Sequence, residues 1–496
     1  MKRVLIIGSG FGGIASALRL RAAGHDVHLI EKLNAIGGRA QVFEHGGYRH
    51  DAGPTVITAP FLFDELFELF GERRSDFIHF KELSPWYRFT YPDGDHFDYG
   101  GTLDDTLNEI ARIEPRDCAG YRSLVAHSKS IFDVGFTKLA HSPFHEFGHM
   151  IKQIPALLKL RSDRTVWELV CKHLCNEKIR QAFSIQPLLV GGSPFDTTSI
   201  YGLIHYLERA YGIHFAMGGT GALIQSLHDL MLRYGVTVQT NATATALNHS
   251  GRKVTGATLQ TGEIIEADNV VFNGDPMTLY RTLLPNQILP IATKIKRDYS
   301  KLSMGLFVLF FGTDRTYESV AHHTIWLGKR YKELLDDIFH RGILADDFSL
   351  YVHRPTATDP SFAPIGHDSF YVLAPVPHQG ANIDWSVEEP KLRSRIIDAL
   401  DASLLPGLKT HIKAPFSMTP DDFAADYLSH LGAGFSIAPT FSQSAWFRFH
   451  NKAEGFENLY LAGAGTHPGA GMPGVLSSAK VIEALISNSI GEKPAK

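Results

Sequence analysis

Glycines near the N-terminus have the spacing of a phosphate-binding turn. The run GSGFGG at residues 8–13 fits the pattern G-x-G-x-x-G. In such a turn the first glycine permits a tight bend, the second lets the backbone approach a pyrophosphate, and the third lets a helix pack closely on a strand. Glu31 follows eighteen residues after Gly13, where a carboxylate can accept hydrogen bonds from ribose hydroxyl groups. These residues predict a dinucleotide site at Gly8, Gly10, Gly13 and Glu31.

The residues on either side of this turn predict the strands and the helix that position it. Residues 3–7 form a short run rich in β-branched residues, which predicts a buried strand. Residues 12–23 predict a helix that stops at Gly24, and residues 27–31 predict a second strand. This order of strand, turn, helix and strand is a βαβ unit, in which the start of the helix binds phosphate.

Two stretches after the second strand extend the predicted site and look like those of flavoproteins. The pair Gly37-Gly38 precedes Arg39, which would add backbone N–H groups and one cation near the same phosphates. Residues 51–55 look like a loop that reaches a flavin ring, although a Gly-Pro turn without function has the same composition. The predicted cofactor-binding residues in these two stretches are Gly37, Gly38, Arg39, Asp51, Gly53, Pro54 and Thr55.

The most distinctive stretch lies near the C-terminus. A strand at residues 458–462 leads into a loop with five glycines and two prolines, and a helix is predicted to begin near Gly474. Pro473 suits the start of a helix. The free N–H groups and dipole of that helix would favour the negative charge of a reduced flavin. The predicted contacts are Gly463, Gly465, Thr466, Pro473, Gly474 and Val475.

Composition sets limits on the class of protein. The chain has 496 residues, 44% of them hydrophobic and 20% charged, which is typical of a globular protein. Its net charge of −4 argues against a nucleic-acid-binding protein. Three cysteines predict no disulfide framework and favour a reducing, cytoplasmic setting. No apolar run is long enough for a spanning helix, and the glycines of residues 8–13 argue against a signal peptide.

The resemblance to a known family extends over nearly the whole chain. Matching stretches are residues 4–13, 37–39, 51–58, 188–195, 199–201, 218–223, 443–448 and 463–475. In these residues the chain resembles the bacterial and fungal-type phytoene desaturases, which are carotenoid desaturase flavoproteins. The resemblance implies FAD, bound by the residues named above together with Ala244. It also implies phytoene as an apolar polyene substrate, converted stepwise to lycopene or neurosporene, with oxygen or quinone as electron acceptor.

The predicted fold class is α/β, and the middle of the chain is inserted between two parts of one nucleotide-binding domain. We expect a Rossmann-like FAD-binding domain, an inserted substrate domain with a mixed β-sheet, and a helical part that associates with the membrane. The expected FAD-binding domain comprises residues 1–60, 215–290 and 440–496. The expected substrate domain comprises residues 61–120 and 291–439, and the helical part comprises residues 121–214.

The chain departs from the family at positions that bear on catalysis. Close relatives carry a carboxylate and an arginine around residues 146–152, where this chain has His149 and Lys152. We therefore take His149 as the proton acceptor and Lys152 as its charge partner, with water or the flavin itself as alternatives. Phe449 stands where the family often has proline, and Ala464-Gly465 replaces the Gly-Asp of many flavoproteins.

Residues 136–164 have the composition of a segment that lies on a membrane surface. Aromatic and aliphatic residues alternate there with Lys138, Lys152, Lys159, Arg161 and Arg164. A basic amphipathic segment can bind anionic lipid, whereas an ordinary helix would pack its apolar side on the core. We therefore predict peripheral association with the membrane for a protein that is otherwise cytoplasmic.

Other activities fit the sequence less well. Cys171 and Cys175 have too few further ligands nearby for a zinc site, and no H-E-x-x-H motif occurs, so no metal is predicted. Alternatives within the enzyme class are a desaturase or isomerase of C30 or hydroxylated carotenoids, and, less well supported, an amine oxidase. An alternative outside it is a carotenoid-binding flavoprotein without turnover.

Overall fold

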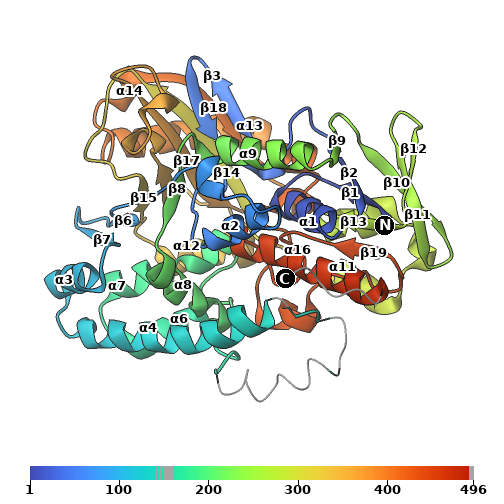
Figure 1. Cartoon of the computed structure of the whole chain (residues 1–496). Helices are drawn as coiled ribbons and strands as arrows, with labels where there is room; N and C mark the ends of the chain where they lie inside the picture. Colours follow the sequence, from blue (N-terminus) through green and yellow to red (C-terminus); the bar gives the residue numbers. More distant parts are fainter. Residues whose placement is uncertain (141, 145–147, 149–159, 491–496) are drawn as a thin grey trace.

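The computed structural model describes residues 1–140, 142–144, 148 and 160–490 (Figure 1). His149 and Lys152, the residues expected to handle the proton, lie outside the described residues, as does Lys159. Within the described part of the chain, no helix is long and apolar enough to cross a membrane.

A parallel sheet of five strands is assembled from distant parts of the chain. Its order is β19-β13-β1-β2-β9. The strands are β1 (Arg3–Ile7), β2 (Asp26–Ile30), β9 (Thr237–Gln239), β13 (Asn269–Phe272) and β19 (Leu459–Leu461). The central strand β1 pairs with β2 on one side and with β13 on the other, so the first and last parts of the chain share one sheet.

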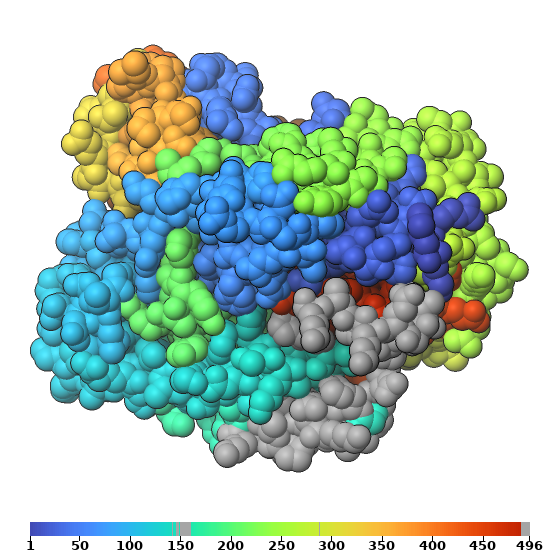
Figure 2. Space-filling view, in the orientation of Figure 1, coloured from blue at the N-terminus to red at the C-terminus, as the bar shows by residue number. Residues whose placement is uncertain are grey.

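The two faces of β1 are covered by different elements because its side chains alternate. Val4 and Ile6 pack against the helices α1 (Phe11–Ala22), α9 (Gly219–Arg233) and α16 (Met472–Ile490). Leu5 and Ile7 face the antiparallel strands β10 (Ala244–Ser250), β11 (Lys253–Leu259) and β12 (Ile264–Glu266). α1 and α16 lie side by side, so blue N-terminal and red C-terminal residues are neighbours in Figures 1 and 2.

A second, mixed sheet has seven strands in the order β18-β14-β17-β16-β15-β6-β7. Only β15 and β6 pair in parallel; the other neighbours are antiparallel. The strands are β6 (Tyr87–Thr90), β7 (His96–Tyr99), β14 (Gly305–Thr313), β15 (His323–Trp326), β16 (Leu350–His353), β17 (Asp368–Val376) and β18 (Ile412–Met418). One face packs on α13 (Trp385–Asp401), and Leu306 on the opposite face lines a cavity.

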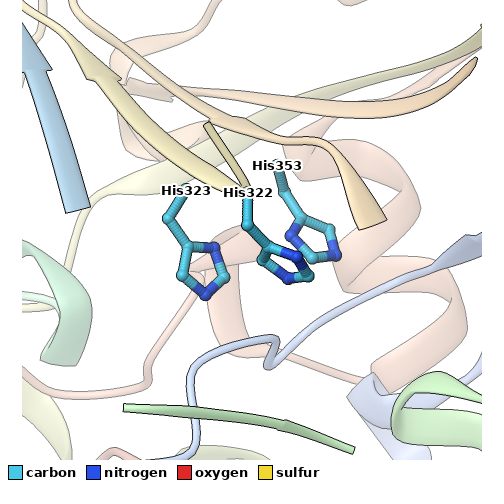
Figure 3. A group of neighbouring side chains, drawn as sticks. All are labelled: His322, His323 and His353. Carbon is cyan, nitrogen blue, oxygen red and sulfur yellow. The ribbon is translucent and has the colours of Figure 1, made fainter. Parts of the chain in front are cut away.

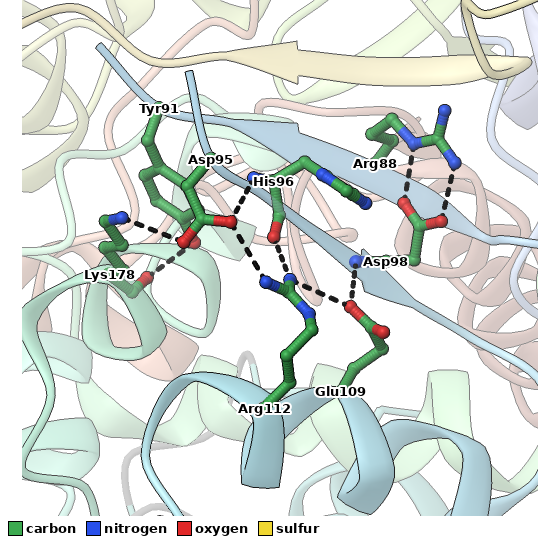
Figure 4. A network of polar contacts seen from close by, with 8 residues as sticks. All are labelled: Arg88, Tyr91, Asp95, His96, Asp98, Glu109, Arg112 and Lys178. Carbon is green, nitrogen blue, oxygen red and sulfur yellow. Dashed lines mark hydrogen bonds and ion pairs between the residues drawn. The ribbon is translucent and has the colours of Figure 1, made fainter. Parts of the chain in front are cut away.

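Helices from the middle of the chain form a layer at the lower left of Figure 1. They are α3 (Leu103–Ile113), α4 (Asp117–Val134), α6 (Val166–His173), α7 (Glu177–Ala182) and α8 (Leu203–Tyr211). A polar network ties α3 and α7 to the β6–β7 hairpin (Figure 4). Asp95 accepts hydrogen bonds from Lys178 of α7 at 2.9 Å and from Arg112 of α3 at 3.0 Å. These groups are partly exposed, so each pair adds about 1 kcal/mol or less to stability.

Shorter elements complete the fold. The helices are α2 (Phe61–Glu68), α10 (Pro276–Thr278), α11 (Ile291–Tyr299), α12 (Tyr331–Asp336), α14 (Leu408–His411) and α15 (Pro420–Tyr427). The strands β3 (Val42–His45) and β4 (Tyr48–Asp51) form one hairpin, and β5 (Phe80–Glu82) pairs with β8 (His214–Ala216). The predicted α/β class, with a Rossmann-like sheet and a second mixed sheet, is confirmed.

The described part of the predicted membrane segment, residues 136–164, turns its apolar side chains inward. Phe136, Leu139, Phe144 and Leu160 are buried. Lys138, Arg161 and Arg164 are exposed, and Arg161 forms an ion pair with Asp163 at 3.2 Å. In these residues the charges lie on the surface and the apolar side packs on the core, as in an ordinary amphipathic helix.

Candidate functional site

A cavity of about 870 Å³ extends from the glycine turn to the helical layer. At one end it is lined by β1, the turn at residues 8–12 and the C-terminal loop at residues 463–475. At the other end its walls come from α8, α12, β15 and β16. Most of these distal wall residues are aliphatic, among them Leu203, Ile204, Leu207, Ile325, Leu327, Leu334, Leu335 and Leu350. Such a wall suits an apolar ligand.

The glycine turn has the geometry that its sequence predicts. Gly8 has a φ of +97°, a conformation that side chains rarely permit. A Cβ on Gly13 would lie 2.0 Å from the carbonyl oxygen of Gly8, so glycine is required for the helix to pack on the turn. A Cβ on Gly10 would have only the amide Nδ2 of Asn273 as a neighbour within 4 Å, at 3.0 Å. The backbone of Gly10 therefore lies open to the cavity and fits the approach of a pyrophosphate.

Glu31 joins the end of β2 to the glycine turn. Its Oε2 accepts hydrogen bonds from the backbone N–H of Ser9 at 2.8 Å and from the Ser9 hydroxyl at 2.6 Å. Its Oε1 accepts one from the backbone N–H of Leu33 at 3.0 Å. A carboxylate has about four acceptor positions, so one remains for a ribose hydroxyl. Glu31 lines the cavity, as expected for that role.

The second glycine pair packs against the first turn. Gly37 and Gly38 have φ values of +116° and +57°. The N–H of Gly37 donates to the carbonyl of Ser9 at 3.1 Å, and a Cβ on Gly38 would lie 3.3 Å from the Cα of Gly10. The two glycine stretches thus form one cradle at the end of the cavity.

Arg39 supplies a partly buried cation beside this cradle. Its Nη2 donates to the hydroxyl of Ser429 at 2.6 Å, and the side chain lines the cavity. Burial lowers the pKa of Arg39, and the negative charge of Asp275 opposes that effect. A positive charge enclosed here fits an anionic cofactor.

The residues of the loop at 51–55 have two different roles. Gly53, Pro54 and Thr55 line the cavity, and the hydroxyl of Thr55 lies 2.6 Å from the hydroxyl of Tyr351 on β16. Asp51 lies outside the cavity lining, because its Oδ2 accepts a hydrogen bond from the backbone N–H of Thr220 in α9 at 3.0 Å. Burial raises the pKa of Asp51 to about 6, although the N–H groups at the start of α9 favour its charged form. Asp51 therefore fastens the loop to the helix.

The C-terminal loop ends in α16, which begins at Met472, two residues before the predicted start. Pro473 is thus the second residue of the helix, where a missing N–H leaves no hydrogen bond unmade. A Cβ on Gly474 would lie 2.5 Å from the carbonyl oxygen of Gly469, so the loop folds closely onto the helix start. Met472, Gly474 and Val475 line the cavity, so α16 begins at the cavity wall.

The side chain of Arg448 binds the backbone of the C-terminal loop. The side chain is fully buried, and its Nε donates to the carbonyl of Thr466 at 3.0 Å. Its Nη2 donates to the carbonyl of Ala464 at 2.6 Å. Thr466, predicted to bind the cofactor, is fully buried and does not line the cavity. Thr466 and Arg448 therefore shape the loop from behind.

The structure brings nearly all predicted cofactor residues to one cavity. Those that line it are Gly8, Gly10, Glu31, Gly37, Gly38, Arg39, Gly53, Pro54, Thr55, Ala244, Gly463, Gly465, Pro473, Gly474 and Val475. Gly13, Asp51 and Thr466 lie behind this lining. The sequence analysis did not identify Asn273, Asp275, Tyr351 and Glu208, which line it as well. Asn273 and Asp275 follow β13, and polar residues at the carboxyl end of a parallel strand were the signal that could have found them.

Three buried histidines form a cluster outside the cavity lining (Figure 3). The ligating nitrogens of His322, His323 and His353 lie within 4.8 Å of one another. His322 Nδ1 contacts the hydroxyl of Thr358 at 2.6 Å, and His323 Nδ1 contacts that of Tyr351 at 2.7 Å. These two contacts engage one nitrogen of His322 and one of His323, and the absence of a metal stays a prediction.

Fold and site together define an oxidoreductase that binds a dinucleotide cofactor beside an apolar substrate cavity. The family model of the flavin containing amine oxidoreductases matches residues 11–481, and the chain belongs to this family. A flavin held by a dinucleotide-binding turn is FAD, so the expected cofactor is confirmed.

Relatives and solved structures agree with this assignment. The chain is 44% identical over 487 residues to a lycopene-forming phytoene desaturase of Pseudescherichia vulneris, covering 98% of this chain and 99% of the relative. It is 40% identical to a neurosporene-forming phytoene desaturase of Rhodobacter capsulatus, covering 99% and 94%. The structure of an oxidoreductase from Methanosarcina mazei has a TM-score of 0.66 at 16% identity, covering 97% and 99%, which shows a shared fold.

Proposed function

We propose that this protein is an FAD-dependent carotenoid desaturase that converts phytoene stepwise to lycopene or neurosporene. The observation that carries the proposal is one continuous cavity, with a phosphate-binding cradle at one end and aliphatic walls at the other. Full-length identity of 44% to a lycopene-forming relative supports phytoene as the substrate. The cavity explains why one site serves both cofactor and polyene.

Each part of the chain has a distinct task in this reaction. The aliphatic residues of α8, α12, β15 and β16 would hold the polyene and exclude water. The flavin, when bound, supplies a hydride acceptor. Backbone N–H groups at the start of α16 would favour negative charge that develops near them. Oxygen or quinone would then reoxidise the cofactor.

We also propose that the protein contacts the bilayer that dissolves its substrate. Support comes from α11, where Ile291, Ile295 and Tyr299 share one face and are 76%, 54% and 81% exposed. Phe441 and Phe447 are exposed as well, and both line the cavity. Exposed apolar side chains that line a cavity, such as Phe441 and Phe447, suit transfer of a polyene from lipid. We call these five residues the α11 surface.

The proposed function is tested by supplying phytoene in liposomes to the FAD-loaded protein and identifying the products. New visible absorption bands and lycopene or neurosporene in the extract are the expected result. Binding of phytoene without any new double bond would instead indicate a carotenoid-binding flavoprotein. Turnover of C30 or hydroxylated carotenoids, but not of phytoene, would indicate one of the related desaturases.

A further inference from the structure

An acidic side chain on α8 lines the apolar cavity and forms no ion pair with the described residues. Glu208 is fully buried, and neither carboxylate oxygen makes a hydrogen bond of good geometry to them, although the side chains of Gln186, Tyr87 and Tyr99 lie close enough to stabilise its charge. Its wall neighbours on the same helix are Ile204 and Leu207. A charged carboxylate in such surroundings is strongly disfavoured, so burial favours its protonated form.

The adjacent cation does not neutralise Glu208. The guanidinium of Arg209 donates to the carbonyl of Gly101 at 2.7 Å and to the hydroxyl of Thr106 at 2.8 Å, and its charge only partly offsets the effect of burial on the pKa of Glu208. It also lies over the ring of Trp86 at 4.4 Å. The groups around Glu208 are therefore mostly neutral: Gln186, Tyr87 on β6, Tyr99 on β7 and Tyr121 on α4.

We propose that Glu208 is the catalytic residue that accepts the proton in each desaturation step. This proposal rests on the proposed function. Loss of a hydride to the flavin, when bound, would leave an electron-deficient allylic carbon in the polyene. The neighbouring C–H bond then breaks, its electron pair becomes the new C=C bond, and the proton moves to a carboxylate oxygen of Glu208. The carboxylic acid that results is neutral and suits its apolar surroundings.

The position of Glu208 links it to the part of the cavity that holds the flavin loop. Tyr87 lies close to Glu208 and to Tyr351. Burial raises the pKa of Tyr87, and the negative charges of Glu208 and Tyr351 raise it further. Tyr351 in turn contacts Thr55 of the loop at residues 51–55. Glu208, Tyr351 and Thr55 all line the same cavity. A polyene that lies along this cavity passes both the flavin loop and the carboxyl group.

Burial also adjusts the proton affinity of this group. It raises the pKa of Glu208 to about 8, and the nearby Gln186 and Tyr99 side chains and the charge of Arg209 only partly oppose it. The carboxylate form therefore becomes the main form above about pH 8. A base with a pKa near the working pH is well suited to general base catalysis.

The test compares Glu208→Gln and Glu208→Asp with the parent, all loaded with FAD and supplied with phytoene in liposomes. Glu208→Gln should lower kcat by at least about 100-fold, because a positioned base contributes roughly 10²–10⁴-fold. Its FAD content and phytoene binding should match the parent, and Glu208→Asp should regain part of kcat. The parent rate should rise through about pH 8, and this rise should be absent in Glu208→Gln. Glu82→Gln is the matched control, because Glu82 on β5 is exposed and outside the cavity lining.

A second measurement does not depend on turnover. Infrared difference spectra of the FAD-loaded protein without phytoene should show a protonated carboxyl group that titrates near pH 8 in the parent and is missing in Glu208→Gln. Parent-like kcat in Glu208→Gln, or no such carboxyl group, would overturn the role of Glu208 while leaving the proposed function intact. A parent that binds phytoene but never desaturates it would overturn the proposed function, and the role of Glu208 with it.

Discussion

Glu31 and Ser9 are joined by two hydrogen bonds, 2.8 Å to the backbone N–H and 2.6 Å to the hydroxyl. They tie the end of β2 to the glycine turn that follows β1. The hydroxyl of Ser9 also lies 3.1 Å from the backbone N–H of Gly37. One serine thus connects the first glycine turn, the acidic residue and the second glycine pair, so a change at Glu31 alters the cradle as well as any contact with ribose.

Replacing Glu31 with glutamine should weaken FAD binding by about 1–3 kcal/mol, the range for lost hydrogen bonds to a charged group. The amide keeps one acceptor oxygen but presents its NH2 group to either Ser9 or Leu33, whose backbone N–H groups themselves donate. Flavin fluorescence during titration of the apoprotein measures the affinity. Glu44→Gln, an exposed change on β3, is the control. Unchanged FAD affinity in Glu31→Gln would contradict the role of Glu31 in the cradle.

Two glycines of the turn should respond differently to alanine. Gly13→Ala should destabilise the protein even without FAD, because the new methyl group meets the carbonyl oxygen of Gly8 at 2.0 Å. Gly10→Ala should fold but retain little FAD, because its methyl group occupies the open side of the cradle. Thermal unfolding of the apoprotein and the flavin-to-protein absorbance ratio separate the two effects. Equal FAD retention in Gly10→Ala and the parent would place the pyrophosphate elsewhere.

The buried imidazole of His205 should make the protein sensitive to acid. Burial lowers its pKa from 6.5 to about 4, and neither ring nitrogen has a hydrogen-bond partner in the described residues. Because the unfolded chain binds the proton more readily, stability is full above pH 6.5 and falls by about 1.4 kcal/mol per pH unit down to about pH 4.

Replacing His205 with phenylalanine should therefore reduce the loss of stability between pH 6.5 and about 4. The ring would keep its contact with Phe183, whose centroid lies 5.9 Å away. Urea unfolding midpoints at neutral and mildly acidic pH measure the difference between the variant and the parent. His411→Phe, at a partly exposed position beside Asp314, serves as the control. An identical pH dependence in parent and variant would show that His205 is not the acid-sensitive group.

Two surfaces are candidates for the lipid contact: the α11 surface and the basic residues of the segment 136–164. Serine in place of Ile291, Ile295, Phe441 and Phe447 should reduce both binding to liposomes and turnover of liposomal phytoene, with FAD content unchanged. Glutamine in place of Lys152, Lys159, Arg161 and Arg164 should act mainly at low salt, because exposed charges are screened over about 10 Å at 0.1 M salt. Co-sedimentation at low and high salt distinguishes the two variants. If the serine variant binds and desaturates like the parent, the α11 surface is not the lipid contact.

The sequence by itself determined the cofactor end of the site. Phosphate binding depends on contiguous residues, since the positive φ of Gly8 and the close packing at Gly13 are properties of one short turn. The strand expected at residues 3–7 is β1 without change, because its run of β-branched residues and its glycine boundary are local signals. For the same reason the sequence could place Gly37, Gly38 and the C-terminal loop beside this turn, and all of them border the cavity.

Only the tertiary structure decided which polar groups share the substrate cavity. Glu208 lies on a helix whose pattern also fits an ordinary amphipathic helix, and Tyr351 lies on a strand of a different sheet. The fold brings them together across more than a hundred residues of chain, and no local sequence pattern encodes such a contact. Composition likewise could not show which side of residues 136–164 faces the core, because burial depends on the neighbours that the fold supplies. Asp51 and Thr466 were assigned to the cofactor for the same reason, although the fold places both behind the lining of the cavity.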